Sequence, residues 1–200
     1  MEESRINAVT NRLYKEANLY VHARNGIKLS HKMPMYARDK IENASKEQLY
    51  NNSDNINHCL KRLSLEDRIE VMERVYEISV EAQTQAIDDN SPEILHKLEE
   101  GKVIEESFHR QLLEIFNDKI LMEKNEDEAK QILSMLPSNQ LEGFLDTIKP
   151  WCNAHKDYKS QFDILTEMGS QILDSREPEY SAFDTTIVET TLTIETAPEA

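Results

Sequence analysis

Apolar side chains recur every three or four residues along most of this chain, which is the spacing of one face of an α-helix. The strongest pattern lies in residues 102–124, where the apolar side chains cover an arc of roughly 180° at about 100° per residue. A helix on the surface of a globular protein shows an apolar stripe nearer 100°. We therefore expect a helix over 102–124 that contacts neighbours on two sides and lies in the middle of a bundle. Its apolar residues are Ile104, Phe108, Leu112, Ile115, Phe116, Ile120 and Met122.

Residues that end helices divide the chain before this segment. Asn25-Gly26 favours a helix end, because glycine tolerates the left-handed conformation of a C-terminal cap. Residues 27–34 should then form a loop, the polar run 51–55 a break, and Gly101 the end of the preceding helix. The resulting helices cover residues 3–25, 35–50, 56–63, 65–87 and 92–100.

Residues that start helices complete this division. Ser64, Ser91 and Asn125 stand where a side-chain oxygen can accept a hydrogen bond from an amide of the first helical turn. After Asn125 the pattern predicts a helix that Pro137 stops, a short helix that follows it, and a last helix opened by Pro150.

These patterns predict an all-α protein, a compact multi-helix bundle of about six to eight helices over residues 1–174. From Ser175 the helical period is lost, and threonine, serine, glutamate and proline become frequent. A segment of that composition buries too little apolar surface to fold alone, so residues 175–200 are expected to form a disordered, flexible tail. Residues 185–194 are rich in β-branched side chains, but a single strand would have no sheet to join.

The charge of the chain is strongly acidic but uneven. The formal net charge is −15, and an acidic surface repels phosphate, so we do not expect nucleic acid as a partner. Residues 1–63 hold 11 basic and 7 acidic residues, net +4, which leaves −19 on the remainder. This basic N-terminal region either neutralises part of the acidic half within the fold or docks an acidic protein or an anionic membrane surface.

Cysteine content and hydropathy bear on the compartment. Cys59 and Cys152 are too few for a disulfide framework, which favours a reducing compartment. The first 15 residues lack the apolar core of a signal peptide. No run of about 18 apolar residues is present, so no transmembrane segment is expected.

Two Glu-x-x-His motifs, Glu93 to His96 and Glu106 to His109, have the form that supplies di-iron sites in four-helix bundles. In such sites every ligand faces the interior of the bundle. Here the motifs lie on consecutive segments only 13 residues apart, and Glu106 and His109 lie at or beyond the edge of the apolar arc. We therefore expect both histidines at the surface and no metal or other cofactor.

Three residues would be candidates for catalysis if the protein were an enzyme. Lys119 lies inside the apolar arc of the central helix, where burial lowers the pKa of an amine and can make it a base or a nucleophile. The alternative is a lysine that lays its stem on apolar surface and keeps its ammonium in water. Cys152 and His155 form a Cys-x-x-His pair, which is half of a zinc site or a thiol with its base. We favour the non-catalytic interpretation of all three.

The composition of residues 175–200 suggests a targeting signal. Their glutamates are spread among small polar residues, with a proline near the end. In this they resemble the C-terminal translocation signals of bacterial Dot/Icm-type (type IVB) secretion effectors. The resemblance implies export from a bacterium into a host cell.

Within this tail, residues 177–181 read Glu-Pro-Glu-Tyr-Ser. They resemble the Glu-Pro-Ile-Tyr-Ala phosphorylation motif of secreted bacterial effectors, with departures at the third and fifth positions. Residues 180–183 also fit a Tyr-x-x-apolar sorting signal. The alternative is a solvated tail with an incidental tyrosine. The candidate recognition residues are Glu177, Pro178, Tyr180 and Phe183.

Three functions follow from these features. The first is a non-enzymatic protein that binds a protein partner through helical faces and the basic N-terminal region. With the tail resemblance, it would be a secreted effector that leaves the bacterial cytoplasm for that of a host cell. The second is an acidic bacterial chaperone or adaptor that stays in the bacterium. The third is an enzyme with a helical active site that uses Lys119, or Cys152 with His155. The pattern predicts no particular oligomeric state.

Overall fold

The structure is a computed structural model that describes residues 3–88, 91–117, 125–154 and 159–176. These residues form seven α-helices and no strand, which confirms the all-α prediction. None of the helices in these residues has both the length and the apolar character that crossing a membrane requires. In chain order the helices are α1 (Glu3–Ser30), α2 (Met35–Lys61), α3 (Leu65–Asp88), α4 (Pro92–Ile115), α5 (Glu126–Met135), α6 (Ser138–Ala154) and α7 (Lys159–Ser175).

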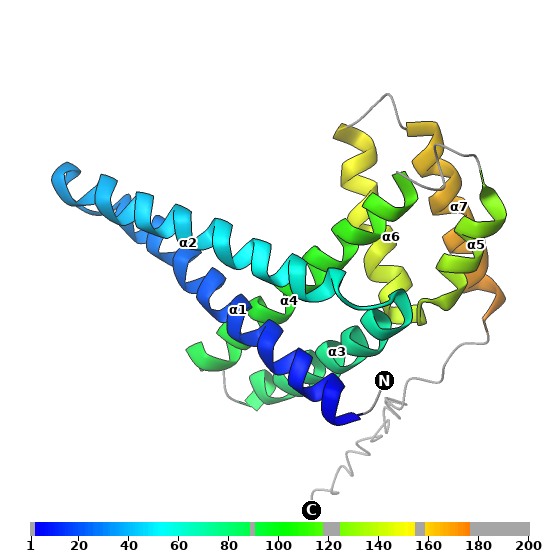
Figure 1. Ribbon diagram of the computed structural model, residues 1–200, viewed down its shortest axis with the longest axis horizontal. Helices are drawn as coiled ribbons and strands as arrows, with labels where there is room; N and C mark the ends of the chain where they lie inside the picture. Colours follow the sequence, from blue (N-terminus) through cyan, green and yellow to red (C-terminus); the bar gives the residue numbers. More distant parts are fainter. Residues whose placement is uncertain (1–2, 89–90, 118–124, 155–158, 177–200) are drawn as a thin grey trace, which may run out of the picture.

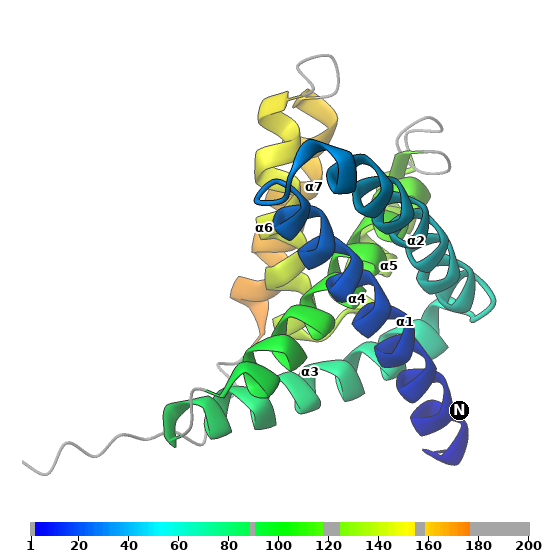
Figure 2. The ribbon, with the colours of Figure 1, turned by 90° about the vertical axis from the view of Figure 1, so that its left-hand side faces the viewer.

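The helices fall into two groups (Figure 1). In the first group, α1 and α2 pair as an antiparallel hairpin and pack with α3 and α4. In the second, α7 contacts both α5 and α6, and α4 joins the groups through contacts with α6. The distal part of the α1–α2 hairpin projects from the rest of the molecule in Figure 1 and points toward the reader in Figure 2. We call residues 29–50 the arm; among them only Ser30 is buried.

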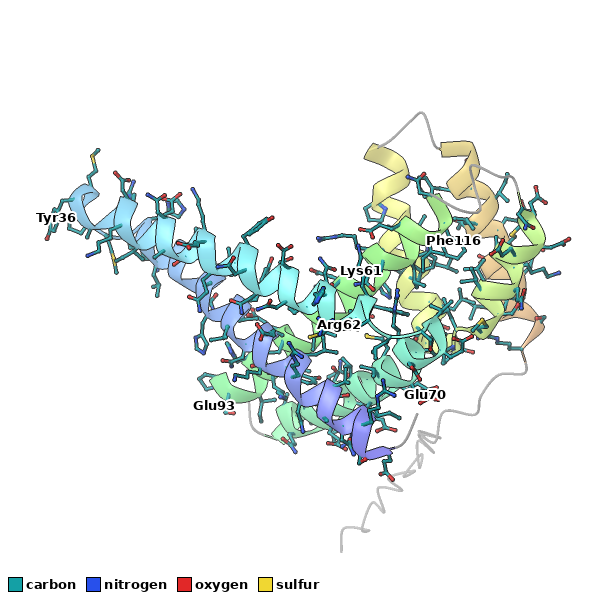
Figure 3. The ribbon with its side chains drawn as sticks, in the orientation of Figure 1. Tyr36, Lys61, Arg62, Glu70, Glu93 and Phe116 are labelled. Atoms are coloured by element: carbon teal, nitrogen blue, oxygen red, sulfur yellow. The ribbon has the colours of Figure 1, made fainter. Side chains whose placement is uncertain are left out.

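Helix α4 lies in the middle of the molecule, as the apolar arc predicts. It contacts α1, α2, α3 and α6. The centroid of the Phe116 ring lies 5.5 Å from that of Phe144 on α6, and Figure 3 shows Phe116 on the side of α4 that faces the second group. Positions 118–124 of the predicted helix lie outside the described residues. The apolar residues of this segment that are at most 1% exposed are Ile104, Phe108, Leu112 and Phe116.

Helix α1 continues through Gly26, where the sequence favours an end. The prediction of a loop over 27–34 is wrong for its first four residues, because α1 ends at Ser30. Gly26 allows close packing instead: a Cβ on it would lie 2.7 Å from Ser45 Oγ of α2. The missing side chain thus lets the two helices of the hairpin approach each other.

Helix α2 likewise runs without interruption across the predicted break at 51–55. The reason is a contact with α1. The side-chain amides of Asn52 and Asn55 donate to Glu16 Oε2 at 2.7 and 3.0 Å. Asparagine disfavours a helix when its side chain competes for the local backbone. Here both side-chain amides donate to the Glu16 carboxylate on α1 instead of competing for the backbone, so the helix continues.

Gly101 and Pro150, predicted at helix boundaries, both lie inside helices, α4 and α6 respectively. A Cβ at Gly101 would lie 2.6 Å from Ser79 Oγ, so this glycine permits close contact between α3 and α4 rather than a helix end. Pro150 is exposed, so water can bond with the carbonyl that lacks an amide partner. The last helix begins at Lys159 instead.

The three helix starts predicted from capping residues, after Ser64, Ser91 and Asn125, are confirmed by side-chain hydrogen bonds. In each case a backbone amide of the first turn donates to the residue that the sequence marks as a cap. Pro92 also follows Ser91 at the first position of α4, as predicted. The cap hydrogen bonds are Asp67 N to Ser64 Oγ (3.1 Å), Ile94 N to Ser91 Oγ (3.4 Å) and Glu128 N to Asn125 Oδ1 (3.2 Å).

Candidate functional site

Most residues that the sequence marks for catalysis or recognition lie outside the described part of the chain. They are Lys119, His155, Glu177, Pro178, Tyr180 and Phe183. Cys152 lies in α6, where only its backbone is described. The proposals for these residues therefore stay predictions. The other cysteine, Cys59, is buried in α2, and burial raises the pKa of its thiol, which makes it a poor nucleophile.

The two Glu-x-x-His motifs do not form a joint site. Each histidine faces the carboxylate four residues away rather than the one three residues before it. His96 Nε2 lies 3.4 Å from Glu100 Oε1, and His109 Nε2 lies 4.0 Å from Glu105 Oε1. Within the described residues, no group of three or more His, Cys, Asp or Glu side chains could hold a metal ion.

His109 is only 3% exposed, so the prediction that it lies at the surface is wrong. Helix α6 covers this face of α4, and Gly143 leaves room for the ring, since a Cβ there would lie 3.3 Å from His109 Cε1. His109 Nδ1 lies 2.8 Å from Thr147 Oγ1. Burial lowers the pKa of His109 to about 4, so the imidazole is neutral near pH 7. The sequence signal is its place beside Phe108, at an arc edge that becomes interior once both sides are covered.

Part of the basic N-terminal region pairs with acids inside the fold. Arg24 Nη2 lies 3.0 Å from Glu99 Oε2, and Lys61 Nζ lies 2.8 Å from Glu114 Oε2. Both acids belong to α4. For these cations the interpretation that the basic region neutralises the acidic half therefore holds.

The end of the arm carries exposed apolar side chains. We call residues 28–40 the arm tip; they comprise the end of α1, the turn and the start of α2. Figure 3 shows Tyr36 at the extreme end of the hairpin. Apolar side chains gathered at an exposed position mark a contact surface more often than scattered ones do. Their exposed fractions are 54% for Leu29, 36% for Met33, 81% for Met35 and 89% for Tyr36.

The arm tip is positively charged although the chain as a whole is acidic. Residues 28–40 carry four lysine or arginine residues and one aspartate, net +3 against −15 for the whole chain. The next acid along α2, Glu42, forms an ion pair with Lys46 at 2.5 Å. The charge of the tip is therefore that of a surface which docks an acidic partner.

Hydrogen bonds order the turn that joins the two helices. Arg38 Nη2 donates to the carbonyl of His31 at 2.9 Å. Ser30 Oγ donates to the carbonyl of Ile27 at 2.7 Å. A surface that is ordered before binding loses less conformational entropy on contact. The sequence signal for it is the apolar run at 33–36 between basic residues, which the helical stripes leave unexplained.

The fold defines an all-α protein in which a helical hairpin projects from a bundle of two groups. No protein-family model, curated protein or solved structure matches the chain. Among the described residues, the most exposed large apolar side chains are Tyr36 at the arm tip and Ile87 near the end of α3, at 89% and 84%.

Proposed function

We propose that this protein is a non-enzymatic interaction protein that binds a protein partner through the arm tip. The observation that supports the proposal is the exposure of Met35 and Tyr36, 81% and 89%, at the end of a projecting hairpin with net positive charge. Methionine, tyrosine and arginine are enriched at the centre of protein interfaces. The partner that fits this surface has an apolar groove bordered by carboxylates.

Burial of the tip would supply much of the binding energy. Complete burial of one leucine or methionine side chain contributes about 1.5–3 kcal/mol. Part of that gain is offset by the entropy lost on association, which the ordered turn reduces. The lysines and Arg38 would act mainly on the rate of encounter and on the choice of an acidic partner.

Two double variants test the arm tip. Met35→Ser with Tyr36→Ser removes its most exposed apolar side chains, and Lys32→Glu with Lys40→Glu reverses its charge. All four residues are exposed, so the free energy of unfolding should stay within about 0.5 kcal/mol of wild type. Photocross-linking from position 34 of the full chain in host-cell lysate, followed by quantitative capture, measures partner binding.

Matched controls remove exposed groups elsewhere: Ile87→Ser with Leu95→Ser for apolar surface, and Lys130→Glu for charge. Both arm variants should reduce capture at least about tenfold, whereas the controls should capture the same partner as wild type. Equal capture by all variants would contradict the proposal. So would arm-dependent flotation with phosphatidylserine vesicles, which would assign the tip to a membrane surface, or arm-dependent self-association in sedimentation.

The tail extends the proposal to a secreted bacterial effector that is made in the bacterial cytoplasm and acts in a host cell. Its support is the resemblance of residues 175–200 to Dot/Icm-type translocation signals. The described body ends at Arg176, whose guanidinium donates to Ser138 Oγ and to the Ser134 carbonyl, both at 3.2 Å. A truncation after Arg176 keeps these contacts with the start of α6 and the end of α5.

Deletion of residues 177–200 should abolish transfer into host cells and leave the helical circular dichroism and the melting temperature unchanged. The matched control is Tyr180→Ala with Phe183→Ala, which keeps the length and acidity of the tail and should still be transferred. Unchanged transfer of the truncated chain would refute the effector part of the proposal and leave the arm untouched.

A further inference from the structure

A cleft of about 260 Å³ lies between α3, α4 and the first turn of α6, where the two groups of helices meet. Its size suits a small organic molecule rather than a drug-sized ligand. It combines an apolar wall with a few polar groups, as ligand sites do. The residues on which its chemistry depends are Met72, Val75, Phe108, Glu105, His109 and Gln140.

Hydrogen bonds assign the tautomer of His109. Thr147 Oγ1 donates its only proton to the Gly143 carbonyl at 3.0 Å, so it accepts from His109 Nδ1 at 2.8 Å. Nε2 is then the unprotonated nitrogen and can accept a hydrogen bond. Its neighbour Glu105 Oε1 lies 4.0 Å away, too far for a hydrogen bond between them.

Gln140 supplies a second acceptor. Its Nε2 donates to the carbonyl of Ile69 at 3.2 Å, which fixes the orientation of the amide. Its Oε1 is buried and finds no donor within the described part of the chain. Buried acceptors without a partner are rare in folded proteins, so this oxygen can accept a hydrogen bond from a bound molecule.

Two glycines allow close contacts between the helices around the cleft. A Cβ on Gly143 would lie 2.9 Å from Glu105 Oε1 and 3.3 Å from His109 Cε1. Of the two, Gly101 lines the cleft, and a Cβ on it would lie 2.6 Å from Ser79 Oγ. The missing side chain of Gly143 thus lets the Glu105 carboxylate and the His109 ring lie close to α6.

We propose that this cleft binds a primary amine with an apolar body. His109 Nε2 and Glu105 Oε1 lie 4.0 Å apart, so one ammonium nitrogen can stand about 2.9 Å from both. Gln140 Oε1 accepts a further donor of the ligand, and the hydrocarbon lies on Met72 and Phe108. An anion would meet three acceptors and no cation among them, so it should be rejected. The inference does not depend on the arm.

The test uses the full chain and two amines. Benzylamine represents a free small molecule, and Nα-acetyl-lysinamide presents the ammonium of a lysine side chain. Benzyl alcohol and benzoate have similar bodies without the cation. In a ¹H–¹⁵N titration the amines should give saturable shifts in α3, α4 and the first turn of α6, and should bind at least about tenfold more tightly than the other two. The tighter amine identifies which source of ammonium the site prefers.

Neighbouring carboxylates provide the matched variants. Glu105→Gln should weaken amine binding at least about tenfold, whereas Glu106→Gln, at an exposed position on α4, should leave it unchanged. Gly143→Ala, whose Cβ would displace the Glu105 carboxylate and the His109 ring, should weaken binding in a chain whose circular dichroism is that of wild type. The proposal is overturned by the absence of saturable shifts, by equal loss in the two glutamine variants, or by benzoate binding as tightly as benzylamine.

Discussion

At the scale of single residues, His109 links the stability of the fold to pH. Its pKa is about 4 in the folded chain against an ordinary value of 6.5. Between these values the unfolded chain binds a proton that the folded chain does not. The contribution of His109 is therefore fully present above about pH 7 and is lost as the pH falls toward 4. At pH 5 the loss should be about 2 kcal/mol.

Urea unfolding at pH 7.5 and 5.0 measures this loss in wild type and in His109→Gln, whose amide can still donate to Thr147. The variant should lose about 2 kcal/mol less than wild type between the two pH values. Burial and Glu106 raise the pKa of Glu105, which acts in the opposite direction, but that residue is present in both proteins. Equal losses would show that His109 is not held neutral in the fold.

Whether the role of a single residue can be predicted from the sequence depends on how many residues separate it from its contacts. The caps Ser64, Ser91 and Asn125 are predictable because each accepts from an amide three residues later. His109 is not predictable in this way, because Gly143, which makes room for its ring, comes 34 residues later and on another helix. The pairing of side chains across helices follows no local pattern.

At the scale of helices, replacing glycine by alanine should have opposite effects on stability at two internal positions, Gly26 and Gly169. In Gly26→Ala the new Cβ meets Ser45 Oγ, and rotation of that one side chain relieves the contact. The gain in helix propensity, about 1 kcal/mol, should then dominate. In Gly169→Ala the Cβ would meet three atoms of buried Leu145 at 2.7, 3.0 and 3.3 Å. Overpacking of that kind costs about 1–3 kcal/mol, and because three atoms of a buried side chain are met at once, the cost should exceed the propensity gain.

Thermal unfolding of the two variants measures the difference. Gly26→Ala should raise the melting temperature by about 2–4 °C, and Gly169→Ala should lower it. Ser45→Ala in the Gly26→Ala background removes the remaining contact and should not lower the melting temperature below that of Gly26→Ala. A decrease in both single variants would mean that α1 and α2 are packed as tightly at Gly26 as α6 and α7 are at Gly169.

The existence of the helices follows from the sequence more securely than their ends do. The stripe of α3 predicts 65–87, and the helix spans Leu65–Asp88. Gly26, Gly101 and Pro150 would end helices in isolated peptides, and in the fold all three lie inside helices. Local propensities amount to about 1 kcal/mol for glycine, which tertiary contacts readily outweigh.

At the scale of the whole molecule, the sequence predicts the centre of the bundle but not its outline. The apolar arc of α4 requires neighbours on two sides, and the helix contacts α1, α2, α3 and α6. The projection of residues 29–50 cannot be predicted from the apolar pattern. The apolar stripe of α2 would be the same in a helix packed against the bundle along its whole length. The cleft beside His109 is hidden for a similar reason, since three helices contribute to it.

Phe116→Ala tests how strongly the two groups of helices depend on each other. The Phe116 ring is fully buried against Phe144 where α4 meets α6, and its loss should cost about 3–5 kcal/mol. Because the contact lies between the groups, the loss should fall mainly on α5–α7. Hydrogen exchange of amides in these helices should accelerate by about two to three and a half orders of magnitude, and that of α1–α3 by less.

Leu13→Ala is the matched control, because Leu13 is equally buried but lies in α1, within the first group. It should accelerate exchange in α1–α3 more than in α5–α7. Equal acceleration throughout the chain in both variants would mean one cooperative unit and would contradict the division into groups. The comparison also bears on the cleft, whose walls come from α3 and α4 on one side and α6 on the other. If the groups separate first, bound amine should slow exchange in α5–α7 of Phe116→Ala, because the ligand would bridge the two groups.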